Sequence, residues 1–162
     1  MRFATVLTLA CGLAHPIQAD NLGTLNPEEG GLNSLEANIA LHPDRIGMLC
    51  WIAYEIQKGG GKESKPAAEV MTTCAKNGNA PSMIMLAHAY ENGLGVEKDL
   101  TQATYWLHEA AQTGYSLAEY HYGMALFTGS GTTKDHAAAR LWLKRAVEHG
   151  SDAAREALSQ VE

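Results

Sequence analysis

Apolar and small residues recur through residues 80–151 with the spacing of α-helices, and glycines interrupt the pattern at regular intervals. Within 81–92 the apolar or small stripe consists of Ser82, Leu86, Ala87 and Tyr90. The stripe stops at Gly93, and a second one begins after Asp99, whose side chain is suited to cap a helix. Each unit is therefore predicted to be a helix, a glycine-containing turn and a second helix.

This unit occurs twice, because residues 86–114 reappear 36 residues later as 122–150 with the special positions in step. The matched residues are Gly93/Gly129, Gly95/Gly131, Lys98/Lys134, Asp99/Asp135, Ala103/Ala139, Trp106/Trp142, Leu107/Leu143, Ala110/Ala146 and Gly114/Gly150. A period of this length marks a unit that buries its apolar face only by stacking on neighbours. The predicted fold is all-α, a short α-solenoid of antiparallel helix-turn-helix repeats with capping helices at both ends.

A degenerate copy precedes these two, since the same shift places Gly114 on Gly78 and Ala103 on Ala67. Its first helix is predicted over 46–56 and its turn over 58–65. Ahead of it, Asn33 can begin a helix that runs to Leu41, which either caps the first repeat or docks into a partner. The expected organisation is a signal segment (1–19), a linker and capping helix (20–44), three repeats (45–79, 80–115 and 116–151) and a closing helix (152–162).

Two cysteines support the degenerate repeat. Cys50 and Cys74 lie equally far from position 62, near the middle of the predicted turn, so they should face each other in an antiparallel helix pair. This spacing predicts a disulfide; the alternative is two buried free thiols.

The motifs of the two regular repeats resemble those of a known family. The strings AYENGLGVEKDLTQATYWLHEAAQTG and ALFTGSGTTKDHAAARLWLKRAVEHG are similar to Sel1-like repeats, relatives of the tetratricopeptide repeat. The resemblance covers the Gly-x-Gly turn, the Lys-Asp pair, the aromatic residue of the second helix and the closing glycine. It implies an α-solenoid whose relatives mostly serve as adaptors and scaffolds, and it names no ligand.

The N-terminus predicts export. Arg2 is followed by the apolar stretch 3–13 and then by Ala19, a small residue suited to signal peptidase. Cleavage there would leave two cysteines, Cys50 and Cys74, an even number as expected of an exported protein. The predicted location is therefore periplasmic or secreted. A lipoprotein cut before Cys11 is disfavoured because Thr8 stands where a lipobox has leucine.

Charge and chemistry limit the function further. The mature chain would carry 11 basic and 18 acidic residues, which disfavours nucleic acid and anionic lipid as partners. We find no nucleophile, metal site or acid–base pair with diagnostic spacing, and no two histidines lie four residues apart on a predicted helix. No catalytic residue, metal or cofactor is therefore predicted.

The outward positions of the two regular first helices carry apolar, aromatic and imidazole side chains where lysine and glutamate would be usual. These equivalent pairs are Ile84/Tyr120, Met85/His121 and His88/Met124. They form a candidate partner-binding row on the concave side of the solenoid. The alternative is that they are buried between adjacent hairpins.

Three functions follow. The chain is predicted to be a periplasmic adaptor or scaffold that binds another envelope protein. One alternative, implied by the resemblance, is an immunity protein that inhibits a toxic effector enzyme such as a secreted lipase. A second, also implied by the resemblance, is β-lactam binding or hydrolysis; it is disfavoured because those relatives repeat the cysteine pair in every unit and this chain has it once.

Overall fold

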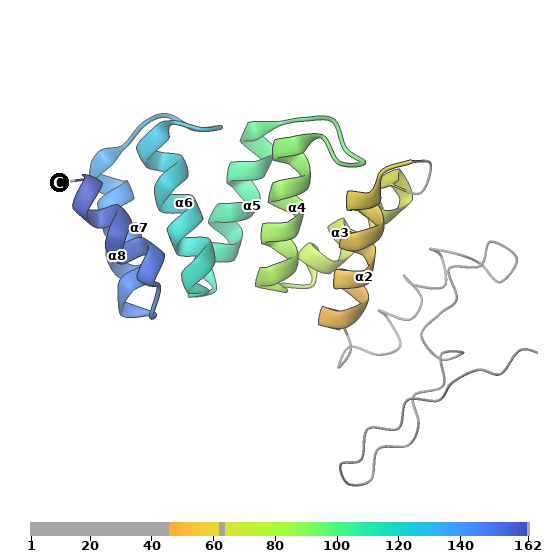
Figure 1. Cartoon of the computed structure of the whole chain (residues 1–162), viewed down its shortest axis with the longest axis horizontal. Helices are drawn as coiled ribbons and strands as arrows, with labels where there is room; N and C mark the ends of the chain where they lie inside the picture. Colours follow the sequence, from red (N-terminus) through yellow and green to blue (C-terminus); the bar gives the residue numbers. More distant parts are fainter. Residues whose placement is uncertain (1–45, 62–63, 162) are drawn as a thin grey trace, which may run out of the picture.

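The computed structural model describes residues 46–61 and 64–161, and within these ranges the chain forms helices and no strand. The helices stand side by side in chain order, as Figure 1 shows. They are α2 (Ile46–Gly59), α3 (Ser64–Lys76), α4 (Ala80–Asn92), α5 (Leu100–Gln112), α6 (Ser116–Thr128), α7 (His136–Glu148) and α8 (Asp152–Val161). The predicted all-α solenoid is confirmed.

Helices α2 to α7 form three hairpins, and α8 follows as a single helix. Each helix packs on its neighbours in the chain, and two pairs of alternate helices also make contact, α2 with α4 and α6 with α8. Contacts therefore pass from one repeat to the next, as in other solenoids.

The predicted turn and cap residues begin and end these helices. Asp99 accepts hydrogen bonds from the backbone N–H groups of Thr101 and Gln102, and Asp135 accepts one from Ala138. Gly93 ends α4 in the left-handed conformation, with a φ of 69°. Residues that carry a side chain rarely adopt this conformation.

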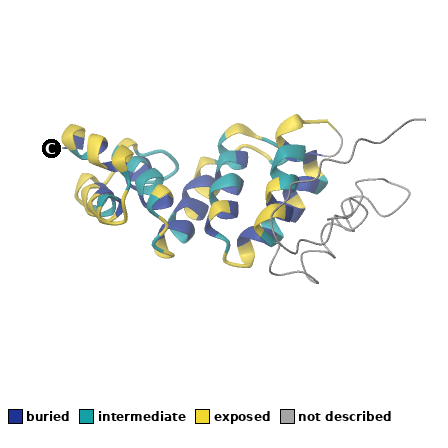
Figure 2. Ribbon diagram, turned by 60° about the horizontal axis from the view of Figure 1, so that its bottom comes forward, coloured by how far each residue is buried: buried dark blue, intermediate teal, exposed yellow. Residues whose placement is uncertain are grey.

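The core lies between the helices, where Figure 2 shows buried residues on the faces that turn toward neighbours. The small residues Ala103 and Ala110 are fully or almost fully buried, and Trp106 and Leu107 are buried beside them. Small residues let the helices approach closely while the large ones fill the remaining space. The predicted helix register is thus correct in α5.

The Gly-x-Gly loops join each hairpin to the one before it. The backbone carbonyl of Leu94 accepts a hydrogen bond of 2.6 Å from the Gln57 side chain. At the equivalent point of the next repeat, the carbonyl of Ser130 accepts one of 2.7 Å from the Thr104 hydroxyl. The same loop position therefore binds the preceding hairpin in both cases, with different donors.

The second glycine of each loop lies where no side chain would fit. A Cβ atom on Gly95 would overlap the backbone of Ser64 at the start of α3, and one on Gly131 would overlap the carbonyl of Leu100 at the start of α5. Each loop therefore rests directly on the second helix of the preceding hairpin.

A disulfide joins Cys50 in α2 to Cys74 in α3, with 5.9 Å between the Cα atoms, which confirms the predicted pair. The turn expected over 58–65 is shorter than predicted, because α2 continues to Gly59 and α3 begins at Ser64. The Ser64 hydroxyl donates a hydrogen bond of 2.9 Å to the carbonyl of Gln57, which ties the two helix ends together.

Helix α8 packs on α7 and α6 after the last hairpin. Its inner face buries Ala154, Ala157 and Val161. Its exposed residues include Asp152, Arg155, Glu156 and Gln160. The guanidinium of Arg140 in α7 donates a hydrogen bond of 2.9 Å to the carbonyl of Val161, which fixes the end of the helix.

A buried ion pair lies between α6 and α7. The Glu119 carboxylate is fully buried and lies 3.1 Å from the Arg145 guanidinium and 2.7 Å from Nδ1 of His149. The equivalent residue of the preceding repeat is Met83, so the sequence pattern gave no sign of this charge. Both partners are about half exposed, which leaves the cluster at the edge of the core.

At the other end, α2 exposes Met48 and Trp51. The predicted signal segment (1–19) and capping segment (20–44) lie outside the described residues. None of the described helices is long and apolar enough to cross a membrane.

We predict that Gly131→Ala destabilises the protein more than Gly150→Ala. Both glycines have positive φ, so both substitutions introduce backbone strain, but an added Cβ meets the Leu100 carbonyl only at Gly131. The difference in free energy of unfolding should be about 2 kcal/mol or more, measured by chemical denaturation. Equal losses in the two variants would contradict direct docking of the loop.

We also predict that replacing both Cys50 and Cys74 with serine lowers the free energy of unfolding by about 3 kcal/mol, because the bridge restricts the unfolded chain. A reducing agent should destabilise the wild type and leave the double variant unchanged. A loss below about 1 kcal/mol would show that packing alone holds the first hairpin.

Candidate functional site

A groove with a volume of about 290 Å³ lies along the first helices of the three hairpins. We call this recess the first-helix groove. Its lining residues are Tyr54, Ile84, Met85, Ala87, His88, Glu91, Leu107 and His121. They come from α2, α4, α5 and α6. The groove therefore exists only because three hairpins are stacked.

Helix α4 supplies most of the lining, and its sequence explains the placement. Ile84 and His88 are four residues apart and share one helix face, and Met85 and Glu91 flank it. The start of the helix is fixed by Asn79, whose side chain accepts a 3.0 Å hydrogen bond from the Ser82 N–H. The capped start and the glycine at the end hold the groove residues on a rigid element.

Two rings meet across the groove. The Tyr54 hydroxyl in α2 lies 3.3 Å from Nδ1 of His88 in α4, and the ring centroids are 6.1 Å apart in an edge arrangement. The Lys58 ammonium lies 5.3 Å from the centre of the Tyr54 ring and also pairs with Glu55 at 3.1 Å. These contacts link the first hairpin to the second at the rim of the groove.

His121 brings the third hairpin into the groove. Burial disfavours the charged imidazolium and lowers the pKa of His121, while the nearby negative charge of Glu91 partly opposes the shift. The imidazole is therefore neutral at pH 7, with nitrogen atoms that can donate and accept hydrogen bonds.

The structure places the six predicted binding residues in two separate groups. Ile84, Met85, His88 and His121 line the groove together. Tyr120 and Met124 lie against the C-terminal core cluster that contains Leu143, Ala146, Ala154, Ala157 and Val161. All six are half-buried, so the row is neither a free surface nor a closed core.

Sequence reasoning missed Tyr54 and Glu91 as groove residues. Tyr54 belongs to the degenerate hairpin, where the shorter turn puts α2 out of the 36-residue register. Glu91 has Phe127 as its equivalent, so no repeated polar position marked it. Only the three-dimensional stacking brings both residues to the groove.

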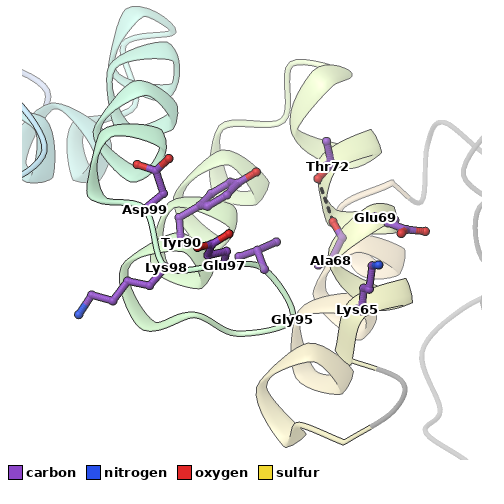
Figure 3. Close-up of a pocket in the computed structure, with 10 residues that line it drawn as sticks. Lys65, Ala68, Glu69, Thr72, Tyr90, Gly95, Glu97, Lys98 and Asp99 are labelled. Atoms are coloured by element: carbon purple, nitrogen blue, oxygen red, sulfur yellow. Dashed lines mark hydrogen bonds between the residues drawn. The ribbon is translucent and has the colours of Figure 1, made fainter.

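A second groove, of about 690 Å³, lies between α3 and the loop that follows α4. Figure 3 shows its lining, with Lys65 and Glu69 on α3 and Lys98 extending away from α3. The Asp99 carboxylate in the same wall already caps α5. This lining mixes charges of both signs, whereas the first-helix groove is mainly apolar with rings at its rim.

The lining of the first-helix groove includes no serine, threonine, cysteine or lysine to act as a nucleophile. Within residues 46–61 and 64–161, no three His, Cys, Asp or Glu side chains are grouped to hold a metal ion.

Comparison with known proteins agrees with this architecture. A family model for the Sel1 repeat matches residues 80–115 and 116–151, which contain the hairpins α4–α5 and α6–α7. Residues 80–151 of this chain are therefore two Sel1-like repeats. Sel1 repeats generally act as scaffolds for protein–protein interaction. No protein of curated function matches the sequence significantly.

Solved structures show the same fold. A Sel1 repeat protein from Oxalobacter formigenes has a TM-score of 0.66 and 25% identity, with 84% of this chain and 57% of that chain covered. A protective antigen of uropathogenic Escherichia coli strains, which displays an SLR fold, has a TM-score of 0.63 and 25% identity, with coverages of 83% and 26%. This Sel1-like chain thus spans little more than half of the first structure and about a quarter of the second.

The Helicobacter pylori cysteine-rich protein B has a TM-score of 0.61 and 19% identity, and the alignment covers 78% of this chain and 96% of that one. At this identity the similarity concerns the fold alone. The Sel1-like architecture is therefore shared by structures of quite different length.

We predict that His121 titrates at a lower pH in the folded protein than in the urea-unfolded chain, as followed by NMR of its imidazole. Because the folded pKa is depressed, the contribution of His121 to stability is complete above the ordinary value of 6.5. That contribution is lost as the pH falls through the folded pKa. Between pH 7.5 and pH 5, the wild type should therefore lose more stability than His121→Gln. Equal losses would contradict burial of this ring.

Proposed function

We propose that this Sel1-like protein is an exported interaction module that binds a partner protein through the first-helix groove. The observation that carries the proposal is the groove itself, an apolar recess rimmed by Tyr54, His88 and His121 and built from three successive hairpins. Aromatic side chains and methionine are favoured at protein interfaces because they offer large contact areas.

The geometry favours binding over chemistry. The rings of Tyr54 and His88 contact each other, and the His121 ring lies edge-on to that of its chain neighbour Tyr120. All three residues lie on helices. Such an arrangement reduces the entropy lost when a partner is bound. The lining of this groove contains no serine, threonine, cysteine or lysine to form an acyl-enzyme, which disfavours the hydrolase alternative.

An exported location fits the disulfide, since such bonds persist in oxidising compartments. In the periplasm the protein would act as an adaptor for an envelope protein. If the partner is instead a toxic effector enzyme, the same groove would make it an immunity protein, so the identity of the partner decides between the two roles.

The test is capture of partner proteins from the envelope fraction of the source organism with the tagged mature chain, using Met85→Asp and Leu141→Asp. Met85 lies in the groove, whereas Leu141 is 64% exposed on α7 and outside it. A charge at Met85 should lower recovery of a stoichiometric partner about tenfold or more, because it must be desolvated at the interface. Leu141→Asp should change recovery less than about twofold.

Circular dichroism and thermal unfolding of both variants serve as the control for folding. Loss of the partner with Leu141→Asp but not with folded Met85→Asp would place the interface on another face and overturn the proposal. An enzyme among the captured proteins, inhibited by the wild type, would favour the immunity role.

A further inference from the structure

We propose that the first-helix groove recognises an apolar side chain, preferably aromatic, that is flanked by a lysine or arginine of the partner, with Glu91 as the residue that selects the cation. This inference rests on the proposed function and specifies the chemistry of the partner segment.

The size and lining of the groove indicate the apolar part. Its volume of about 290 Å³ is at the lower limit of ligand sites, which suits one large side chain better than an extended ligand. Ile84, Met85 and Leu107 supply an apolar surface, and the rings of Tyr54 and His88 border it. A ring inserted here would meet other rings at their edges and a polarisable sulfur.

The charge of the lining indicates the cation. Glu91 is the one acidic residue among the lining residues, and the imidazole of His121 is neutral at pH 7 because burial lowers its pKa. Among the described residues, no lysine or arginine lies within ion-pair distance of Glu91. The nearby cation Lys58 is already paired with Glu55. The groove therefore presents an uncompensated carboxylate.

A partner that covers this carboxylate must compensate it. Covering an unpaired charge at an interface removes its water, which is unfavourable unless a counter-charge replaces that water. Lysine or arginine next to the inserted side chain would supply that counter-charge, whereas aspartate or glutamate there would be repelled. Glu91 would thus contribute more to discrimination than to affinity.

The half-buried position of Glu91 on α4 makes this selection local. The chain as a whole is acidic, with a formal net charge of −6, so any basic peptide is attracted weakly at long range. Selection by Glu91 must exceed this general attraction and must depend on the side chain in the groove. These two requirements determine the controls.

The test uses three blocked pentapeptides, Gly-Lys-Phe-Lys-Gly, Gly-Glu-Phe-Glu-Gly and Gly-Lys-Ala-Lys-Gly, titrated into the folded mature protein and followed by NMR. The signals observed are the Met85 methyl group and the His121 imidazole. Lys-Phe-Lys should bind at least about fivefold more tightly than either of the other two.

The variants are Glu91→Gln and, as a matched control, Glu97→Gln. Both remove one negative charge, but Glu97 is exposed on the loop after α4 and lines the other groove. With Glu91→Gln the preference for Lys-Phe-Lys over Glu-Phe-Glu should fall below about twofold, while Glu97→Gln should retain it.

The outcomes separate the two proposals. If Lys-Phe-Lys and Glu-Phe-Glu bind the groove equally well, or if both variants change the preference alike, the role of Glu91 is wrong and the groove remains a binding site. If none of the peptides shifts the groove signals at about 5 mM, the inference is overturned. In that case the proposed function would still stand if the folded Met85→Asp variant failed to capture the partner.

Discussion

Docking of each Gly-x-Gly loop onto the preceding hairpin is the contact on which the remaining structure depends. The carbonyls of Leu94 and Ser130 accept hydrogen bonds from the previous hairpin, and Gly95 and Gly131 bring the loop backbone against its second helix. Because backbone meets backbone, the spacing between hairpins has little freedom. That spacing brings residues of α2, α4, α5 and α6 together, and these residues line the first-helix groove.

The two ends of the array are stabilised differently from its middle. The turn of the first hairpin lacks the Gly-x-Gly-x-x-Lys-Asp pattern of the other two, and a disulfide links its two helices covalently. At the other end, α8 covers the last hairpin with a polar outer face. A short solenoid needs such devices because each repeat is stabilised only by its neighbours. The groove lies near the first hairpin, so the disulfide also supports Tyr54 at its rim.

Most of the fold could be predicted from the sequence because its signals are local and repeated. Glycines and aspartates at a fixed offset gave the helix ends, and the positions of Cys50 and Cys74 gave the disulfide. Features that depend on contacts between hairpins were missed. The close approach of Gly131 to Leu100 and the buried charge of Glu119 are not visible in a periodic pattern.

The candidate site shows the same limit. Ile84, Met85, His88 and His121 were found from their unusual character on an outward helix face, and they line one groove. Tyr120 and Met124 occupy equivalent positions but pack toward the C-terminal cluster, because α8 supplies apolar surface beside them. Tyr54 and Glu91 were missed because a changed register and an unrepeated residue hid them. Equivalent positions in a repeat therefore need not share a function when their neighbours differ.

The central claim is that the partner contacts the first-helix groove, and site-specific photo-cross-linking tests it most directly. A benzophenone amino acid would replace Met85 in one variant and Leu141 in another, and each would be irradiated in complex with the captured partner. The account predicts a covalent adduct from position 85 and none from position 141. An adduct from position 141 alone, with both variants folded, would contradict it.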